Sequence, residues 1–79
     1  MQTTVEISMY PLTRDFTGPI IDFIDRLNAY EDLSVETNRL STQVSGDYER
    51  VMDALRIEMR KSLERDETVV MVMKVLNIS

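Results

Sequence analysis

The stretch Leu33-Ser34-Val35-Glu36-Thr37-Asn38-Arg39-Leu40-Ser41-Thr42-Gln43-Val44-Ser45 contains two short runs in which apolar or threonine positions alternate with polar ones. Alternation with a period of two is typical of half-buried strands, and the short connection between the runs favours a tight turn. We therefore expect two antiparallel strands joined as a hairpin in the middle of the chain.

A strand and then a helix are expected before this hairpin. The segment from Thr3 to Tyr10 alternates in the same way, and Pro11 should end the strand because proline cannot donate to a ladder. Apolar residues then recur at intervals of three and four, at Ile20, Phe23, Ile24 and Leu27. This spacing predicts an amphipathic helix that ends near Ala29 or Tyr30, with either Asp15 or Gly18 as its cap.

A second helix and a last strand are expected after the hairpin. Gly46 interrupts the alternation, and Asp47 is a suitable N-cap. The predicted buried stripe of the helix consists of Tyr48, Val51, Met52, Leu55, Met59 and Leu63, with Ile57 exposed on the opposite side. The last strand, from Thr68 to Leu76, is apolar on both faces, so both faces must be covered.

The order strand, helix, strand, strand, helix, strand predicts an α+β fold of the ferredoxin-like βαββαβ type. This is a two-layer sandwich, with a four-stranded antiparallel sheet and two helices on one face. The whole of residues 1–79 is expected to form one domain. The second face of the sheet has no helix to cover it, so we expect a second subunit, a ligand, or both to pack there.

The composition excludes most classes of enzyme. The chain has no Cys and no His, which removes thiolate chemistry, the commonest general base and the commonest zinc ligands. Its six Met residues lie on several elements and are better explained as core and interface filler than as a metal site. Its two Gly residues form no phosphate-binding loop. We expect no catalytic residue, no metal and no cofactor.

The charge and hydropathy limit the partners. A net charge of −5, with nine scattered basic residues, argues against nucleic acid, whose recognition needs clustered cations. No apolar run approaches the about 18 to 20 residues that a membrane span needs, and no signal sequence opens the chain. We expect a soluble cytoplasmic protein. A chain of this size buries only about 60% of its unfolded surface, which favours oligomerisation.

Two polar interruptions of the strand pattern mark a candidate binding site. They are Ser8-Met9-Tyr10-Pro11-Leu12, at the end of the first strand, and Thr37-Asn38-Arg39-Leu40-Ser41-Thr42, between the two strands of the hairpin. Hydroxyl, phenol and amide groups at neighbouring strand ends can orient a small ligand without reacting with it. The same residues could also be ordinary strand and turn residues, with Tyr10 fixing the strand exit and Glu36 a solvated edge charge.

These segments resemble the YkoF-like family of thiamine- and hydroxymethylpyrimidine-binding proteins. The resemblance rests on Val5-Glu6-Ile7-Ser8-Met9-Tyr10-Pro11-Leu12, Asp15-Phe16, the 37–42 connection closing with Gly46, and Val69-Val70-Met71. It implies a ferredoxin-like domain that binds the pyrimidine end of thiamine or of a precursor. YkoF itself carries two such domains, whereas this chain has one copy. Asn38 stands where some members carry an acidic residue.

The chemistry of a pyrimidine ligand suggests roles for the polar residues, because its pocket needs hydroxyl or amide groups for the ring edge and an aromatic or Met side chain for the ring face. Ser41, Thr42, Asn38 and Ser8 would bond the pyrimidine edge, and Tyr10 or Phe16 would limit the pocket. Glu36 and Glu6 are expected on the second face of the sheet, which no helix covers, and a carboxylate there could offset a thiazolium charge. The family resemblance also implies a homo-dimer or homo-tetramer formed by sheet packing. The function expected is non-enzymatic sequestration, delivery or sensing of thiamine or its hydroxymethylpyrimidine moiety.

Two alternatives remain at this point. The first is a structural or regulatory homo-oligomer with no small-molecule ligand, in which the second sheet face is purely a protein interface. The second is an enzyme component that acts on a pyrimidine with a catalytic group supplied by a partner chain, since no residue here activates Ser41 or Thr42.

Overall fold

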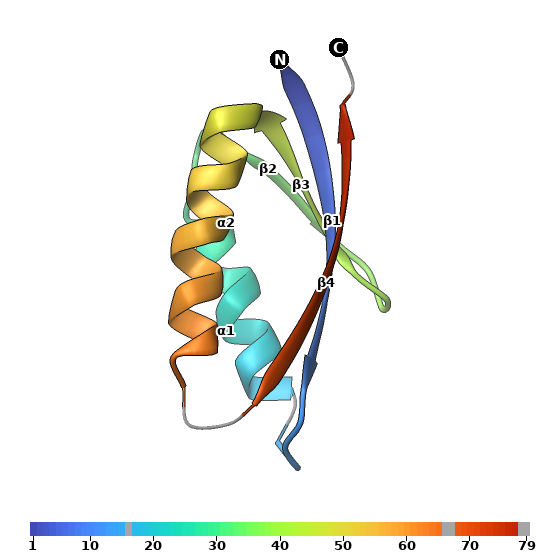
Figure 1. The fold of residues 1–79 in the computed structure, drawn as a ribbon, viewed down its shortest axis with the longest axis vertical. Helices are drawn as coiled ribbons and strands as arrows, with labels where there is room; N and C mark the ends of the chain where they lie inside the picture. The colour runs from blue at the N-terminus through green and yellow to red at the C-terminus, as the bar shows by residue number, and fades with distance from the viewer. Residues whose placement is uncertain (16, 66–67, 78–79) are drawn as a thin grey trace.

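The computed structural model describes residues 1–15, 17–65 and 68–77. Its six elements follow the predicted order: β1 (Gln2–Pro11), α1 (Thr17–Asn28), β2 (Ser34–Thr37), β3 (Thr42–Asp47), α2 (Tyr48–Leu63) and β4 (Val69–Asn77). The strands form one antiparallel sheet in the order β2-β3-β1-β4. Both helices cover the same face of that sheet (Figure 1). The ferredoxin-like α+β fold expected from the sequence is therefore confirmed.

The element ends differ from the expectation by a few residues, for local reasons. Pro11 is the last residue of β1, opposite Val69. The Asp15 carboxylate accepts a hydrogen bond from the Gly18 N–H at 3.3 Å, so Asp15, rather than Gly18, caps the start of α1. Asp47 precedes α2 as predicted, although its side chain makes no capping hydrogen bond.

Gly46 lies inside β3 instead of ending it, which corrects the expected break. It is opposite Thr3 of β1, and the strand continues to Asp47. A Cβ atom at position 46 would lie 2.9 Å from Leu33 Cδ2, and the residue has a φ of +158°. Residues with a Cβ atom rarely adopt this φ, so the backbone conformation favours glycine here, whereas the flexible end of the Leu33 side chain could shift.

The core lies between the sheet and the helices. Residues that alternate along β1 and β3 point toward α1 and α2, and they meet one stripe from each helix. The buried apolar core consists of Val5, Ile7, Phe23, Leu27, Val44, Val51 and Leu55. Leu63 is half exposed, which corrects the predicted stripe of α2, and Ala54, Glu58 and Ser62 are buried instead.

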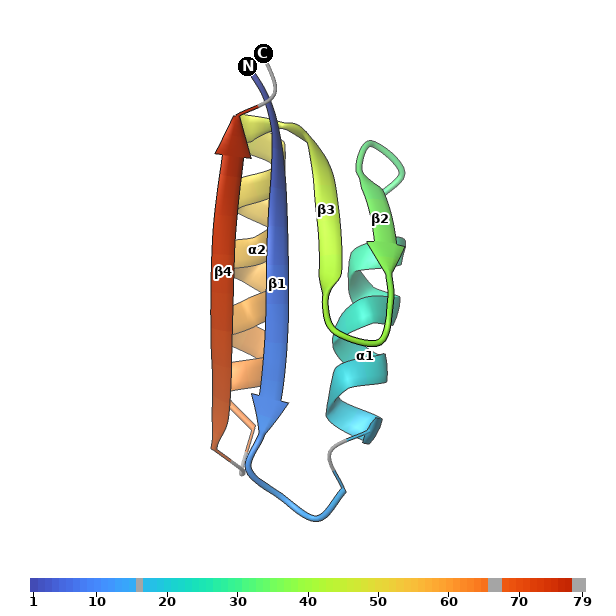
Figure 2. The same ribbon diagram turned by 90° about the vertical axis from the view of Figure 1, so that its right-hand side faces the viewer.

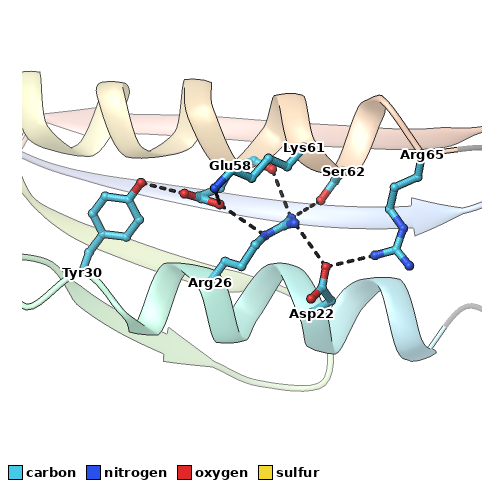
Figure 3. A network of polar contacts seen from close by, with 7 residues as sticks. All are labelled: Asp22, Arg26, Tyr30, Glu58, Lys61, Ser62 and Arg65. Carbon is cyan, nitrogen blue, oxygen red and sulfur yellow. Dashed lines mark hydrogen bonds and ion pairs between the residues drawn. The ribbon is translucent and has the colours of Figure 1, made fainter.

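A polar network joins the two helices and explains this shift of the α2 stripe (Figure 3). Arg26 of α1 lies between Asp22, at 3.1 Å, and Glu58 of α2, at 3.2 Å, and its guanidinium also donates to the Ser62 hydroxyl at 2.5 Å. The Tyr30 hydroxyl donates to the second Glu58 oxygen at 2.7 Å. Glu58 is only 4% exposed, so these contacts compensate for the burial of its charge.

The opposite face of the sheet, which we call the open face, carries no helix (Figures 1 and 2). Its β1 and β4 rows pair Tyr10 with Val70, Ser8 with Val72, Glu6 with Lys74 and Thr4 with Leu76. Val70, Val72 and Leu76 are 44%, 51% and 60% exposed. β4 is also an edge strand, and in the described residues no strand pairs with its outer side. No described helix is long and apolar enough to cross a bilayer.

Candidate functional site

A cavity of about 260 Å³ lies between the first half of α1 and the strand ends that face it. β1 contributes its C-terminal residues, and the 37–42 segment between β2 and β3 closes one side. The lining consists of Ile7, Met9, Tyr10, Ile20, Phe23, Ile24, Thr37, Asn38, Arg39, Leu40, Ser41 and Thr42. We call this cavity the α1 pocket.

The walls of the α1 pocket are apolar because the two periodicities of the fold meet there. Ile7 and Met9 are two apart on β1 and share the helix-facing side of the sheet. Ile20, Phe23 and Ile24 are three and four apart on α1 and share the side that faces the sheet. The Phe23 side chain is 2% exposed, so an aromatic ring forms part of the buried wall.

Two threonines form a polar edge on the same wall. Thr37 and Thr42 are directly opposite in the β2–β3 pairing, so their side chains point to the same side of the sheet. Their hydroxyl oxygens are 3.2 Å apart, and either can be the donor. Thr42 is 5% exposed. Because each hydroxyl can donate one bond and accept others, this pair retains capacity for a ligand.

Asn38 shapes the turn and leaves a donor group available. Its Oδ1 accepts hydrogen bonds from the N–H groups of Leu40, at 2.8 Å, and Ser41, at 3.0 Å. The backbone N–H of Asn38 donates to the Ser41 carbonyl at 3.0 Å. Among the described residues no hydrogen bond occupies the side-chain nitrogen of Asn38, Nδ2, which can therefore donate to a bound molecule.

The structure separates the six predicted site residues into two groups. Thr42, Asn38, Ser41 and Tyr10 border the α1 pocket. The Ser41 hydroxyl, however, donates to Glu6 Oε2 at 3.1 Å, on the open face. Tyr10 belongs to the open-face row and is 52% exposed.

Ser8 and Glu36 do not border the pocket. Ser8 lies on the open face, where its hydroxyl donates to the Leu40 carbonyl at 3.2 Å. Glu36 is opposite Gln43 on the same face. Glu6, Ser8 and Asn38 therefore form no common concavity among the described residues. Phe16, the other candidate for limiting the pocket, lies outside the described residues.

Sequence reasoning missed Thr37, Phe23 and Arg39 as lining residues. The signal for Thr37 was present, because a hairpin that joins β2 to β3 by a short turn puts Thr37 opposite Thr42. Phe23 was assigned only to the helix core, because the sequence cannot separate a buried ring that contacts other side chains from one that also borders a cavity. Arg39 was quoted as part of the turn without a role.

Three other hollows in the described part of the molecule differ from the α1 pocket in chemistry. One lies over the polar network at Arg26 and Glu58, one is an apolar depression between α2 and Met73, and one lies on the open face above Glu6 and Lys74. No cluster of three metal-ligating side chains occurs among the residues described. Of the four hollows, the α1 pocket combines an aromatic wall with hydroxyl and amide groups.

The family comparison covers almost the whole chain. The model of the YKOF-related family matches residues 2–78, and the chain therefore belongs to that family. No protein with a curated description matches the chain.

Solved structures share the fold at low sequence identity. A hypothetical protein from Methanocaldococcus jannascii is 24% identical, with a TM-score of 0.83 over 99% of this chain and 81% of its own. A candidate thiamine biosynthesis or salvage protein from Thermotoga maritima is 21% identical, with a TM-score of 0.83 over 98% of this chain and 84% of its own. A domain of unknown function from Bacillus cereus is 14% identical, with a TM-score of 0.73 over 98% of this chain and 76% of its own.

Proposed function

We propose that this protein binds the hydroxymethylpyrimidine moiety of thiamine, or of a thiamine precursor, in the α1 pocket. The observation that carries the proposal is the meeting of the Phe23 ring with the Thr37–Thr42 hydroxyl pair inside one cavity of a YKOF-related chain. The similarity to a candidate thiamine biosynthesis or salvage protein supports the same ligand class.

The pocket is chemically complementary to an aminopyrimidine. Such a ring has acceptor nitrogens on its edge, an exocyclic amine that donates, and an apolar face. The Asn38 amide nitrogen and the threonine hydroxyls supply donors for the ring nitrogens, and a threonine oxygen can accept from the amine. The Phe23 wall can cover the ring face.

Binding without a chemical reaction is the activity that the lining supports. General acid–base catalysis needs a positioned group that titrates near the working pH, and carboxylate and imidazole groups are the usual ones. The described lining of the α1 pocket contains neither a carboxylate nor an imidazole. We therefore propose sequestration, delivery or sensing as the role. The cytoplasmic location expected from the sequence stays a prediction.

We also propose that the protein is a homo-oligomer that packs through its open face. Tyr10, Val70, Val72 and Leu76 give that face an exposed apolar strip over β1 and β4. The same strip favours the second candidate function, a structural oligomer without a ligand. If the oligomer also binds a ligand, the α1 pocket stays accessible to that ligand, because the α1 wall of the pocket lies on the helix side of the sheet.

The test is isothermal titration of the purified protein with hydroxymethylpyrimidine and, in parallel, with thiamine. We expect saturation at one ligand per chain with a Kd on the order of micromolar, as suits a ligand of about ten non-hydrogen atoms. Chromatography of the ligand after incubation should recover it unchanged. Absence of saturable binding by both ligands would contradict the proposal and favour the structural oligomer. Conversion of the ligand would contradict the non-enzymatic role.

A further inference from the structure

An exposed arginine, Arg39, borders the α1 pocket, and hydroxymethylpyrimidine alone has no negative charge to pair with it. Arg39 is the one residue of the pocket's described lining with a full charge at neutral pH. The inference drawn from this residue concerns the ligand of the same pocket, and it therefore rests on the proposed function.

The Arg39 guanidinium forms no ion pair within the described part of the protein, unlike most other arginines there. Arg26, Arg50 and Arg60 each pair with a carboxylate, at 3.1, 2.6 and 2.6 Å respectively. Arg39 is exposed and makes no ion pair or hydrogen bond with another described residue. Arg14 and Arg56 also lack an ion pair there, but neither borders the α1 pocket.

The carboxylates that could balance a cationic ligand lie elsewhere. Glu36 is on the open face, and Glu6 is held on that face by the Ser41 hydroxyl, at 3.1 Å, and by Lys74, at 3.9 Å. Asp15 does not border the pocket, and its carboxylate already bonds the Gly18 N–H at the start of α1. A thiazolium cation in the pocket would therefore meet Arg39 without a neighbouring anion to offset the repulsion.

We infer that the preferred ligand is a phosphate monoester of the pyrimidine, and that Arg39 binds its phosphate group. An arginine presents two parallel N–H groups that match two phosphate oxygens, and it keeps its charge at all physiological pH values. Arg39 follows Asn38 directly, so the same turn can place the amide on the ring edge and the guanidinium on the ester.

The experiment compares four probes by titration calorimetry: hydroxymethylpyrimidine, its phosphate monoester, thiamine and inorganic phosphate. We expect the monoester to bind about tenfold to a hundredfold more tightly than the free alcohol, as a charge-assisted hydrogen-bond pair should provide. Thiamine should bind more weakly than the monoester. The advantage of the monoester should shrink as salt is raised, because Arg39 is exposed. Inorganic phosphate should not bind measurably alone.

The variant that isolates the contribution of Arg39 is Arg39→Gln. It should remove most of the advantage of the monoester over the free alcohol, so that the two affinities become similar. Arg56→Gln is the matched control, because it removes the same charge from an exposed position on α2 outside the pocket. This control should keep the full preference for the monoester.

Four outcomes would overturn the inference. Equal binding of alcohol and monoester, or an equal loss of both in Arg39→Gln, would overturn it while leaving the proposed function intact. Tight binding of inorganic phosphate alone would show an anion site that does not read the pyrimidine. Failure of all the pyrimidines to bind would remove both the inference and the proposed function.

Discussion

At the scale of single residues, the direction of a side chain from its strand decides which predicted groups can reach the ligand. Ser41 immediately precedes β3 and Thr42 begins it, and their two hydroxyls point to different sides of the sheet. Thr42 faces α1 and Thr37, whereas the Ser41 hydroxyl bonds Glu6 on the open face. The sequence identified the hydroxyl pair, but only the strand register divides it.

The two residues therefore give a matched pair of variants. Thr42→Val keeps the shape of the side chain and removes the hydroxyl, so it should weaken hydroxymethylpyrimidine binding by about 1 to 3 kcal/mol. Ser41→Ala removes a hydroxyl that points away, and its affinity should match that of the wild type. Titration calorimetry of both variants makes the comparison. An unchanged affinity in Thr42→Val, or the larger loss in Ser41→Ala, would exclude Thr42 from the site.

Tyr30 provides a prediction about pH. The hydrogen bond to Glu58 is the largest cause that raises the pKa of Tyr30, followed by burial and the Glu58 charge. A raised folded-state pKa contributes stability that is complete below about pH 10, the unfolded value, and is lost as the pH rises through the folded value. As the pH rises above about 10, the wild type should therefore lose more stability than Tyr30→Phe. The free energy of unfolding is measured by urea denaturation at each pH. The same pH dependence in the two proteins would refute this linkage.

At the scale of elements, the packing of α1 against α2 depends on a buried ion pair as well as on apolar side chains. Arg26 and Glu58 lie between the helices, and their two facing atoms, Nε and Oε1, are 3.2 Å apart without a well-aligned hydrogen bond. Tyr30, Asp22 and Ser62 complete the coordination of the pair (Figure 3). A buried charge that loses its partner is costly, so this network fixes how the two helices sit together.

Glu58→Gln tests that statement. It removes the charge but keeps the size of the side chain, and it should lower the free energy of unfolding by about 1 to 3 kcal/mol, because the partly buried Arg26 loses its ion pair with Glu58 and keeps the one with Asp22. Glu64→Gln breaks the exposed pair with Arg60 and should change the free energy of unfolding much less, because solvent screens that pair. Urea denaturation measures both. Comparable losses in the two variants would show that the buried network adds nothing to stability.

The elements were more predictable than the site. Alternation and helical spacing were enough to predict the order of the six elements, because each period is a local property of the chain. The α2 stripe was wrong at Leu63 and missed Glu58 and Ser62, since a polar residue buried by a partner on another helix leaves no apolar signal. Local patterns could not predict the α1 pocket either, because its wall residues come from elements that are separate in the sequence.

At the scale of the whole molecule, the sheet separates two surfaces with different tasks. Both helices lie on one side of the sheet (Figure 2). That side contains the core and the α1 pocket, and the open face presents an apolar strip that includes half-exposed Val70 and Val72. A small domain buries a limited fraction of its surface, so covering this strip would add stability. We therefore propose that the ligand binds on one side of the sheet and that a second copy of the chain packs on the other.

Val72→Asp tests the assignment of the open face. A carboxylate at this position would be desolvated in a packed interface, and the variant should dissociate to a monomer at micromolar concentration. Ile57→Asp is the control, because Ile57 is 38% exposed on α2, away from the open face. Multi-angle light scattering should give an oligomeric mass for the wild type and for the control. A monomeric wild type, or an oligomer that survives Val72→Asp, would contradict this interface.

The central claim is that a pyrimidine binds on the helix side of the sheet, in the α1 pocket. Amide chemical-shift mapping of the labelled protein, titrated with hydroxymethylpyrimidine, tests it most directly. We expect saturable shifts at Thr37, Asn38, Thr42 and the first turns of α1, with the amides of Lys74 and Leu76 on β4, the edge strand far from the pocket, unmoved. Shifts confined to the open-face strip of β1 and β4, or no shifts at all, would contradict it.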